Sequence, residues 1–307
     1  MSTGDLVTAG RPAAGEPPAG EIAWHPSAFR AWVRMYRSEL GLIFLRWRNV
    51  ALLAVLAAIP VLTGVALKLA APSGRGQGPA FLDQVAGNGV FLAFLALTVM
   101  LTLVLPLAVA VVSGDSIAGE AGHGTLRYLL TVPAGRTRLL AIKYGALLTF
   151  CVASCVLISA VALATGAAAF PVGPVTLLSG DTVSLADGLL RLLLVTLYVA
   201  AGMGALAAIG LAISTLTEHA IAAIAAILVI AIASEVCDNI PQFSIVHPYL
   251  PTHFWLSFDG LLRSPVAWSG VGHGLLSFAV YAVIFGAIAW ARLGGAEIGR
   301  ASCRERV

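Results

Sequence analysis

The sequence predicts an all-α integral membrane protein with six transmembrane helices. Two observations carry this prediction. Hydrophobic residues make up 59% of the 307 residues and charged residues only 11%, whereas soluble domains carry about 25% charged residues. The apolar residues also gather into runs of about 20, the length that a helix needs to cross the hydrocarbon core of a bilayer. This composition suits a lipid surrounding and not an aqueous one.

Six apolar runs divide the central part of the chain. The predicted spans are 49–71, 90–112, 143–170, 188–214, 220–236 and 271–291. Pro60 and Pro106 lie inside the first two spans, and we expect each to kink its helix. The fourth span is rich in Gly and Ala around 200–210, which predicts close packing against neighbouring helices. We therefore assign residues 49–296 to one six-span domain.

The distribution of Lys and Arg predicts the orientation of the chain, because cytoplasmic segments carry an excess of these residues. One set of segments holds eleven of them, whereas the other set holds four, with the last three Arg of the chain left out. The richer set is Arg11, Arg30, Arg34, Arg37, Arg46, Arg48, Arg127, Arg136, Arg138, Lys143 and Arg292. We expect a multi-pass protein of the plasma membrane with both termini in the cytosol.

The N-terminal part is predicted to have two sections. Residues 1–23 are rich in Pro, Ala and Gly and lack the apolar stretch of a signal peptide, so we expect a disordered cytosolic tail. Residues 24–48 are predicted to form an amphipathic helix at the inner membrane surface. Its aromatic face and its basic face lie about a quarter turn apart. The first has Phe29, Trp32, Val33, Tyr36 and Leu40, and the second has Arg30, Arg34 and Arg37. This helix is either a simple basic membrane anchor or an interface that also contacts a cytosolic partner, with Trp32, Arg34 and Arg37 as its candidate residues.

The polar segment 113–143 carries the most functional information. Asp115 or Ser116 is suited to begin a short helix, and Pro133 ends it because a residue before proline avoids helical geometry. Leu126, Leu129 and Leu130 give this segment a small apolar patch. A short, stiff helix between two spans can transmit a push from a docked cytosolic protein, whereas a flexible loop cannot. The alternative is an ordinary cytosolic hairpin.

One set of residues in this segment resembles a known family. The motif consists of Glu120, Gly124, Thr125, Leu126, Leu129, Leu130, Pro133 and Arg136. It resembles the cytosolic signature after the second of six spans in permeases of type-2 ABC exporters. In that family the segment is a coupling helix that docks on a separate ATPase. Arg127 lies within the motif and would orient the hairpin or pair with an acidic group of the partner, although the resemblance assigns it no role.

The resemblance implies a permease subunit of an ATP-driven exporter. Its partners would be an ABC ATPase, which binds ATP and Mg, a second permease that is identical or a paralogue, and membrane lipid. No cofactor would bind this chain directly, and the cargo is not identified. The net charge of +3 is too small to indicate nucleic acid.

The segment 240–270 is too apolar for a free loop, and backbone at membrane depth must satisfy its hydrogen bonds internally. We expect short helices, separated by Pro241, Pro248 and Pro251, that re-enter the outer leaflet; the resemblance implies the same. His247 and His253 could bind a metal or pack at the interface. Two His without a third ligand make a weak metal site, so none is expected.

Several motifs that would indicate other functions are missing. His123 stands where the phosphate-binding loop of an ATPase needs Lys, and no metalloprotease or serine hydrolase motif is present. The span interiors carry few ionisable groups, although ion-coupled carriers usually need them at mid-depth. These absences favour an energy source outside the chain. A carrier that needs no ATPase and a membrane scaffold are the alternatives.

The last eleven residues, 297–307, differ from the rest of the chain. Their sequence, EIGRASCRERV, matches a translation of a short-read sequencing adapter. We therefore expect an assembly artefact after residue 296, with the native C-terminus elsewhere. A basic cytosolic tail is the alternative.

Overall fold

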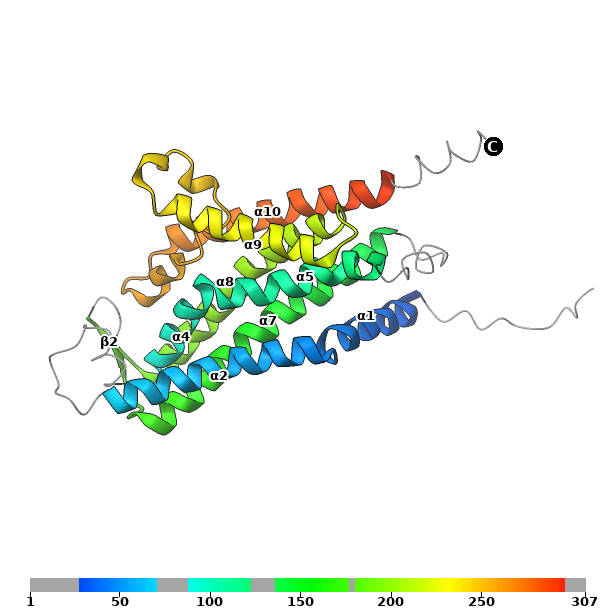
Figure 1. Cartoon of the computed structure of the whole chain (residues 1–307). Coiled ribbons are helices and arrows are strands. Elements are labelled where there is room, and N and C mark those ends of the chain that lie inside the picture. Colours follow the sequence, from blue (N-terminus) through cyan, green and yellow to red (C-terminus); the bar gives the residue numbers. More distant parts are fainter. Residues whose placement is uncertain (1–27, 71–87, 123–135, 177–179, 296–307) are drawn as a thin grey trace, which may run out of the picture.

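The computed structural model describes residues 28–70, 88–122, 136–176 and 180–295. This part of the chain is a bundle of long helices with one small two-stranded sheet (Figure 1). The helices are α1 (Ala28–Phe44), α2 (Trp47–Ala70), α4 (Phe91–Thr102), α5 (Val104–Gly122), α7 (Arg136–Ala169), α8 (Leu185–Ser214), α9 (Ala220–Asp238) and α10 (Trp268–Gly295). The antiparallel strands are β1 (Val175–Thr176) and β2 (Thr182–Val183).

The predicted class of an all-α membrane protein is confirmed. Five helices of the described part, α2, α7, α8, α9 and α10, are long and apolar enough to cross a membrane, and the bent pair α4–α5 makes a sixth crossing if it is one span. The end of α5, the start of α7 and the end of α10 lie at the same end of the bundle as α1 (Figure 1). An even number of crossings produces this arrangement.

The second span bends by 54° between α4 and α5. The break is at Leu103, whose backbone leaves helical geometry with φ −144° and ψ −48°. Pro106 explains this position, because proline has no N–H to donate to the carbonyl four residues earlier, that of Thr102, and its ring collides with that carbonyl. The predicted kink at Pro106 is therefore present, one turn before the proline. By contrast, α2 continues as a helix through Pro60.

α8 forms the centre of the bundle, with neighbours α5, α7, α9 and α10. Close packing depends on its glycines, as the sequence predicted. A Cβ atom at Gly210 would lie 2.1 Å from Ser113 Oγ on α5, and one at Gly204 would lie 2.7 Å from Leu148 on α7. Without side chains at these two positions, α8 approaches both neighbours closely.

The connection from α9 to α10 contains three short 3-10 helices, η2 (Pro241–Phe243), η3 (His247–Tyr249) and η4 (Ser257–Leu262). Two side chains attach it to α8. The hydroxyl of Tyr198 donates to the carbonyl of Phe254 at 2.6 Å. The Arg191 guanidinium donates to the carbonyls of Leu261 and of Arg263, the latter at 3.0 Å. Short helices were predicted here, and re-entry into the outer leaflet stays a prediction.

The predicted N-terminal helix is present over Ala28–Phe44, and the preceding residues 24–27 lie outside the described part. Trp32 stacks on Tyr36 with 5.6 Å between ring centroids, while Arg34 and Arg37 are exposed. Tyr36 belongs to the predicted aromatic face. Its hydroxyl donates to the carbonyl of Gly145, so this side of α1 packs on α7 and does not face lipid headgroups.

Candidate functional site at the α5–α7 end of the bundle

The predicted coupling residues fall mostly outside the described part of the chain. Gly124, Thr125, Leu126, Arg127, Leu129, Leu130 and Pro133 all lie within residues 123–135. Of the remaining two, Glu120 lies in the last turn of α5, and Arg136 is the first residue of α7. The structure therefore describes the two helices on either side of the predicted coupling segment.

One expectation about this segment was wrong. Asp115 or Ser116 was expected to begin a short helix after the second span. Instead α5 runs without interruption through both residues to Gly122. Within this continuous helix, the Asp115 carboxylate accepts hydrogen bonds from Arg46 and Arg48.

α7 is longer than the predicted third span, which began at Lys143. The helix starts seven residues earlier, at Arg136, and has 34 residues. At about 1.5 Å for each residue, it is about 50 Å long, whereas the hydrocarbon core of a bilayer is about 30 Å thick. At least one end of α7 must therefore extend beyond the membrane core, and the charges near Lys143 mark the start of α7 as that end.

Lys143 is the centre of the first charged cluster at this end. Its side chain is 4% exposed and lies among three helices. Its ammonium group donates to Glu120 of α5 at 2.7 Å and to Glu39 of α1 at 3.3 Å. It also donates to the backbone carbonyl of Ser116 at 3.1 Å. One buried cation thus connects α7 with α5 and with α1.

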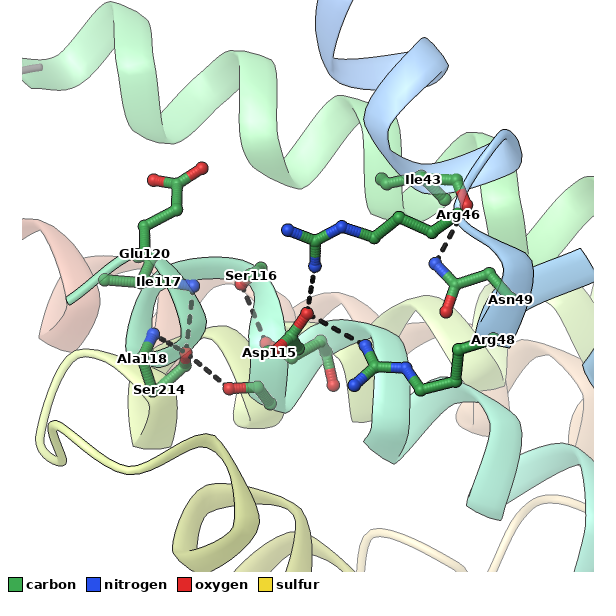
Figure 2. Close-up of polar contacts among 12 residues, drawn as sticks. Ile43, Arg46, Arg48, Asn49, Asp115, Ser116, Ile117, Ala118, Glu120 and Ser214 are labelled. Carbon is green, nitrogen blue, oxygen red and sulfur yellow. Dashed lines mark hydrogen bonds and ion pairs between the residues drawn. The ribbon is translucent and has the colours of Figure 1, made fainter. Parts of the chain in front are cut away.

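Asp115 is the centre of the second charged cluster (Figure 2). Its carboxylate accepts hydrogen bonds from Arg46 and from Arg48, and the Arg48 contact is 2.8 Å long. Both Arg side chains are about half exposed, whereas the Asp115 side chain is 11% exposed. Arg46 and Arg48 lie where α1 ends and α2 begins. This cluster therefore attaches the α1–α2 junction to α5.

A small cavity of about 40 Å³ is bordered by residues of both clusters. Its charged neighbours are Glu39, Arg46, Asp115, Glu120 and Lys143. Together with Arg48, these residues comprise three acids and three bases, so the formal charges balance. A balanced set of charges can be held in a partly buried place, where an unpaired charge would be costly.

Ser214, at the end of α8, makes a third polar contact with α5 (Figure 2). Its hydroxyl donates to the carbonyl of Gly114 at 2.8 Å and accepts from the amides of Ile117 at 3.1 Å and Ala118 at 2.9 Å. Gly114 and Ala118 are partners in the hydrogen-bond ladder of an α-helix. A side chain inserted at such a pair is a recognised cause of local helix distortion. α8 thus contacts the backbone of α5 beside Asp115.

His247 and His253, where no metal site was expected, lie near the same carboxylate. His253 Nδ1 lies 2.6 Å from an Asp238 carboxylate oxygen at the end of α9, and His247 Nδ1 lies 3.9 Å from the same oxygen. Within the described ranges, no group of three or more His, Cys, Asp or Glu residues could hold a metal ion. The His residues therefore join the η3 segment to α9.

Comparison with known families identifies this helix arrangement. The family described as "ABC-2 family transporter protein" matches residues 45–234, which is more than half of the chain. The chain belongs to the ABC-2 family of transporter proteins. No curated protein matches the sequence. The family match runs from the α1–α2 junction into α9 and leaves out α1 and α10. This ABC-2 permease is a component of membrane transport and not itself a catalyst.

Within the ABC-2 permease, most of the charged site belongs to the matched region. Arg46, Arg48, Asp115, Glu120, Lys143 and Ser214 lie inside it, whereas Glu39 lies before it. Sequence analysis missed these residues as a cluster. One signal was present in the sequence. Acidic residues follow the second predicted span, and basic residues precede the first. Both sets are predicted to lie on the same side of the membrane, where their opposite charges could pair. Nothing in the sequence pointed to Ser214.

Proposed function

We propose that the chain is the permease subunit of an ATP-driven exporter in the plasma membrane, with both termini in the cytosol. A separate ABC ATPase would bind ATP and Mg, and a second permease subunit would complete the pathway. The docking site for the ATPase would be the segment 123–135, with Gly124, Thr125, Leu126, Arg127, Leu129, Leu130 and Pro133, together with Glu120 and Arg136 beside it. This proposal rests on the family match and on the motif in the sequence.

The observation that carries the proposal is the position of Lys143. It pairs with Glu120, which lies only a few residues before the segment 123–135, and it belongs to the helix that follows that segment. The two helices that flank the proposed docking site are therefore fixed to each other. Through Glu39, the same cation also holds α1. A force applied to the segment would move α5, α7 and α1 together.

Contacts elsewhere in the bundle would pass a movement of α5 to the helices around the transport pathway. The second span is broken at Leu103, so α5 can change its angle to α4 without bending a continuous helix. Ser214 connects the same part of α5 to α8 at the centre of the bundle. ATP binding by the partner would shift the permease between two arrangements by such rigid-body movements.

Co-purification tests the partnership. The tagged permease is produced together with the ABC ATPases of the same genome, and the proteins bound to it are identified. We expect one ATPase to be retained by the wild type and lost with Leu129→Asp, which puts a charge in the predicted apolar patch. Arg292→Gln, a charge change at the end of α10, is the control and should retain the ATPase.

Transport in liposomes supplies the opposing outcome. Cargo movement that continues without any nucleotide would show that no ATPase is needed and would overturn the proposal. Retention of the same ATPase by the wild type and by Leu129→Asp would place the docking site elsewhere.

A further inference from the structure

A second cavity lies between α4 and η4, in the part of the bundle where α4 begins. Its volume is about 330 Å³, which is within the range of about 300–1,000 Å³ that is usual for small-molecule sites. α4 contributes Phe91, Phe94 and Thr98, and η4 contributes Phe258 and Asp259. Leucines complete the wall. The site is separate from the charged clusters, which adjoin the end of α5.

The lining of this cavity favours positive charge. Three of its residues, Phe91, Phe94 and Phe258, have phenyl rings, whose faces attract cations. Asp259 adds a carboxylate, and none of the lining residues is a base. The hydroxyl of Thr98 donates its hydrogen to the carbonyl of Phe94 at 2.9 Å. That hydroxyl can therefore offer only lone pairs to a ligand.

The present partner of Asp259 is one that a ligand can replace. Asp259 pairs with Arg263 at 3.1 Å, and both side chains are more than half exposed. Exposed pairs of this kind contribute little to stability. Arg263 is not part of the cavity wall. A cation inside the cavity would therefore compete with Arg263 for the carboxylate at little cost to the fold.

We propose that this cavity binds a small organic cation with an apolar body, such as an aromatic or alkyl ammonium compound. The apolar body would contact the phenyl rings and leucines, and the positive group would lie near Asp259. As a statement about cargo, this rests on the proposed transport function. As a statement about binding, it concerns this chain alone.

Equilibrium dialysis tests the proposal with purified permease in phosphatidylcholine nanodiscs. The probe is benzyltrimethylammonium, and its neutral isostere neopentylbenzene has carbon in place of the ammonium nitrogen. Binding to empty nanodiscs is subtracted for both. We expect saturable binding of the cation and no saturable binding of the isostere. Saturable binding of both compounds with equal affinity would show an apolar site, such as one for a lipid chain, and would overturn the proposal.

Three variants locate the site. Asp259→Asn should weaken cation binding about fivefold, the effect of one charge pair of about 1 kcal/mol. Arg263→Gln should strengthen it, because the competing base is gone. Asp187→Asn removes a carboxylate at the start of α8, away from the cavity wall, and should leave binding unchanged. The melting temperature of each variant checks that it is folded.

An Asp259→Asn protein that is folded and binds the cation as the wild type does would overturn the proposed site. Because no ATPase is present, this result would leave the partnership with an ATPase untouched. In the same way, loss of ATPase binding by Leu129→Asp is independent of cation binding.

Discussion

Lys143 on α7 lies 2.7 Å from Glu120 on α5, so a largely buried ion pair joins the helices on the two sides of residues 123–135. Glu39 adds a second carboxylate to the same ammonium group from α1. In a bundle whose other contacts are mostly apolar, this is a directional connection between three helices. Its removal is therefore the most direct test of whether these helices act as one unit.

Lys143→Met should destabilise the permease strongly. The change leaves two carboxylates without their cation in a place with little water, and breaking a buried pair typically costs about 3–5 kcal/mol. Thermal unfolding of the purified protein measures the effect. Lys68→Met, which removes an exposed Lys from the last turn of α2, is the matched control and should change the melting temperature little.

A rescue variant separates the charge effect from a packing effect. Adding Glu39→Gln to Lys143→Met removes one of the unpaired carboxylates, so it should recover part of the lost stability. Equal losses for Lys143→Met and Lys68→Met would show that the pair contributes little to the fold.

The spans could be predicted from the sequence because they depend only on the length and hydrophobicity of continuous segments. The charged site could not, because it depends on which helices become neighbours. Asp115 follows an apolar run and has polar neighbours in the sequence, so the span was predicted to end before it and a separate short helix to begin at Asp115 or Ser116. Its partner Arg48 is 67 positions away in the sequence. Only the packed bundle shows that these charges pair and that α5 continues past Asp115 to Gly122.

The bend between α4 and α5 could be predicted in part from the sequence. Pro106 indicated a kink in the second span, and the local rule for proline explains the break at Leu103. The same rule predicted a kink at Pro60, where α2 is not interrupted. Local sequence thus identified where a helix can be broken, but the same local rule did not distinguish Pro106 from Pro60.

Ser214→Ala should lower stability by about 1–3 kcal/mol, the usual range when a buried polar contact is lost. The variant removes one donated and two accepted hydrogen bonds between α8 and α5. The control is Ser159→Ala, which removes one hydroxyl contact, to Thr196, elsewhere in the core. We expect a smaller loss there, since Thr196 also donates to a carbonyl of its own helix. Equal melting temperatures for the two variants would contradict a special role of Ser214.

Gly210→Ala should separate α8 from α5. Its Cβ atom would lie 2.1 Å from Ser113 Oγ, which is held in place by its hydrogen bond to Val109. Overpacking of this kind costs about 1–3 kcal/mol. Gly286→Ala makes the same change in α10, where a Cβ atom meets nothing within 4 Å. That control should be neutral or stabilising by up to about 1 kcal/mol, because Ala favours helices. Thermal unfolding compares the two, and a similar melting temperature for both would argue against close α5–α8 packing.

Accessibility labelling tests the orientation on which the proposed function depends. Thr125→Cys in a background with Cys237→Ser and Cys303→Ser should react with a membrane-impermeant maleimide in inverted vesicles and not in intact cells. Cys237 is partly exposed at the opposite end of the bundle, near the end of α9. In a separate protein that carries only Cys303→Ser, Cys237 should show the reverse pattern. Labelling of position 125 from outside intact cells would exclude docking of a cytosolic ATPase there.

Gly124→Pro tests whether the segment transmits force and does not only bind. Proline fixes the backbone angle φ near −65° and removes an N–H donor, so it would alter the shape of the segment while leaving its charges and apolar side chains in place. Charge reversal by Arg136→Glu, at the start of α7, should act in the same direction. In liposomes that contain the permease and its ATPase, we expect ATP hydrolysis to continue while its stimulation by cargo is lost. Gly173→Pro, in the connection between α7 and α8, is the control and should keep the stimulation. Lys143 holds α5, α7 and α1 together next to the segment, so a force on the segment should reach all three helices. If cargo still stimulates ATP hydrolysis normally in Gly124→Pro, the ATPase must move the helices through a contact other than this segment.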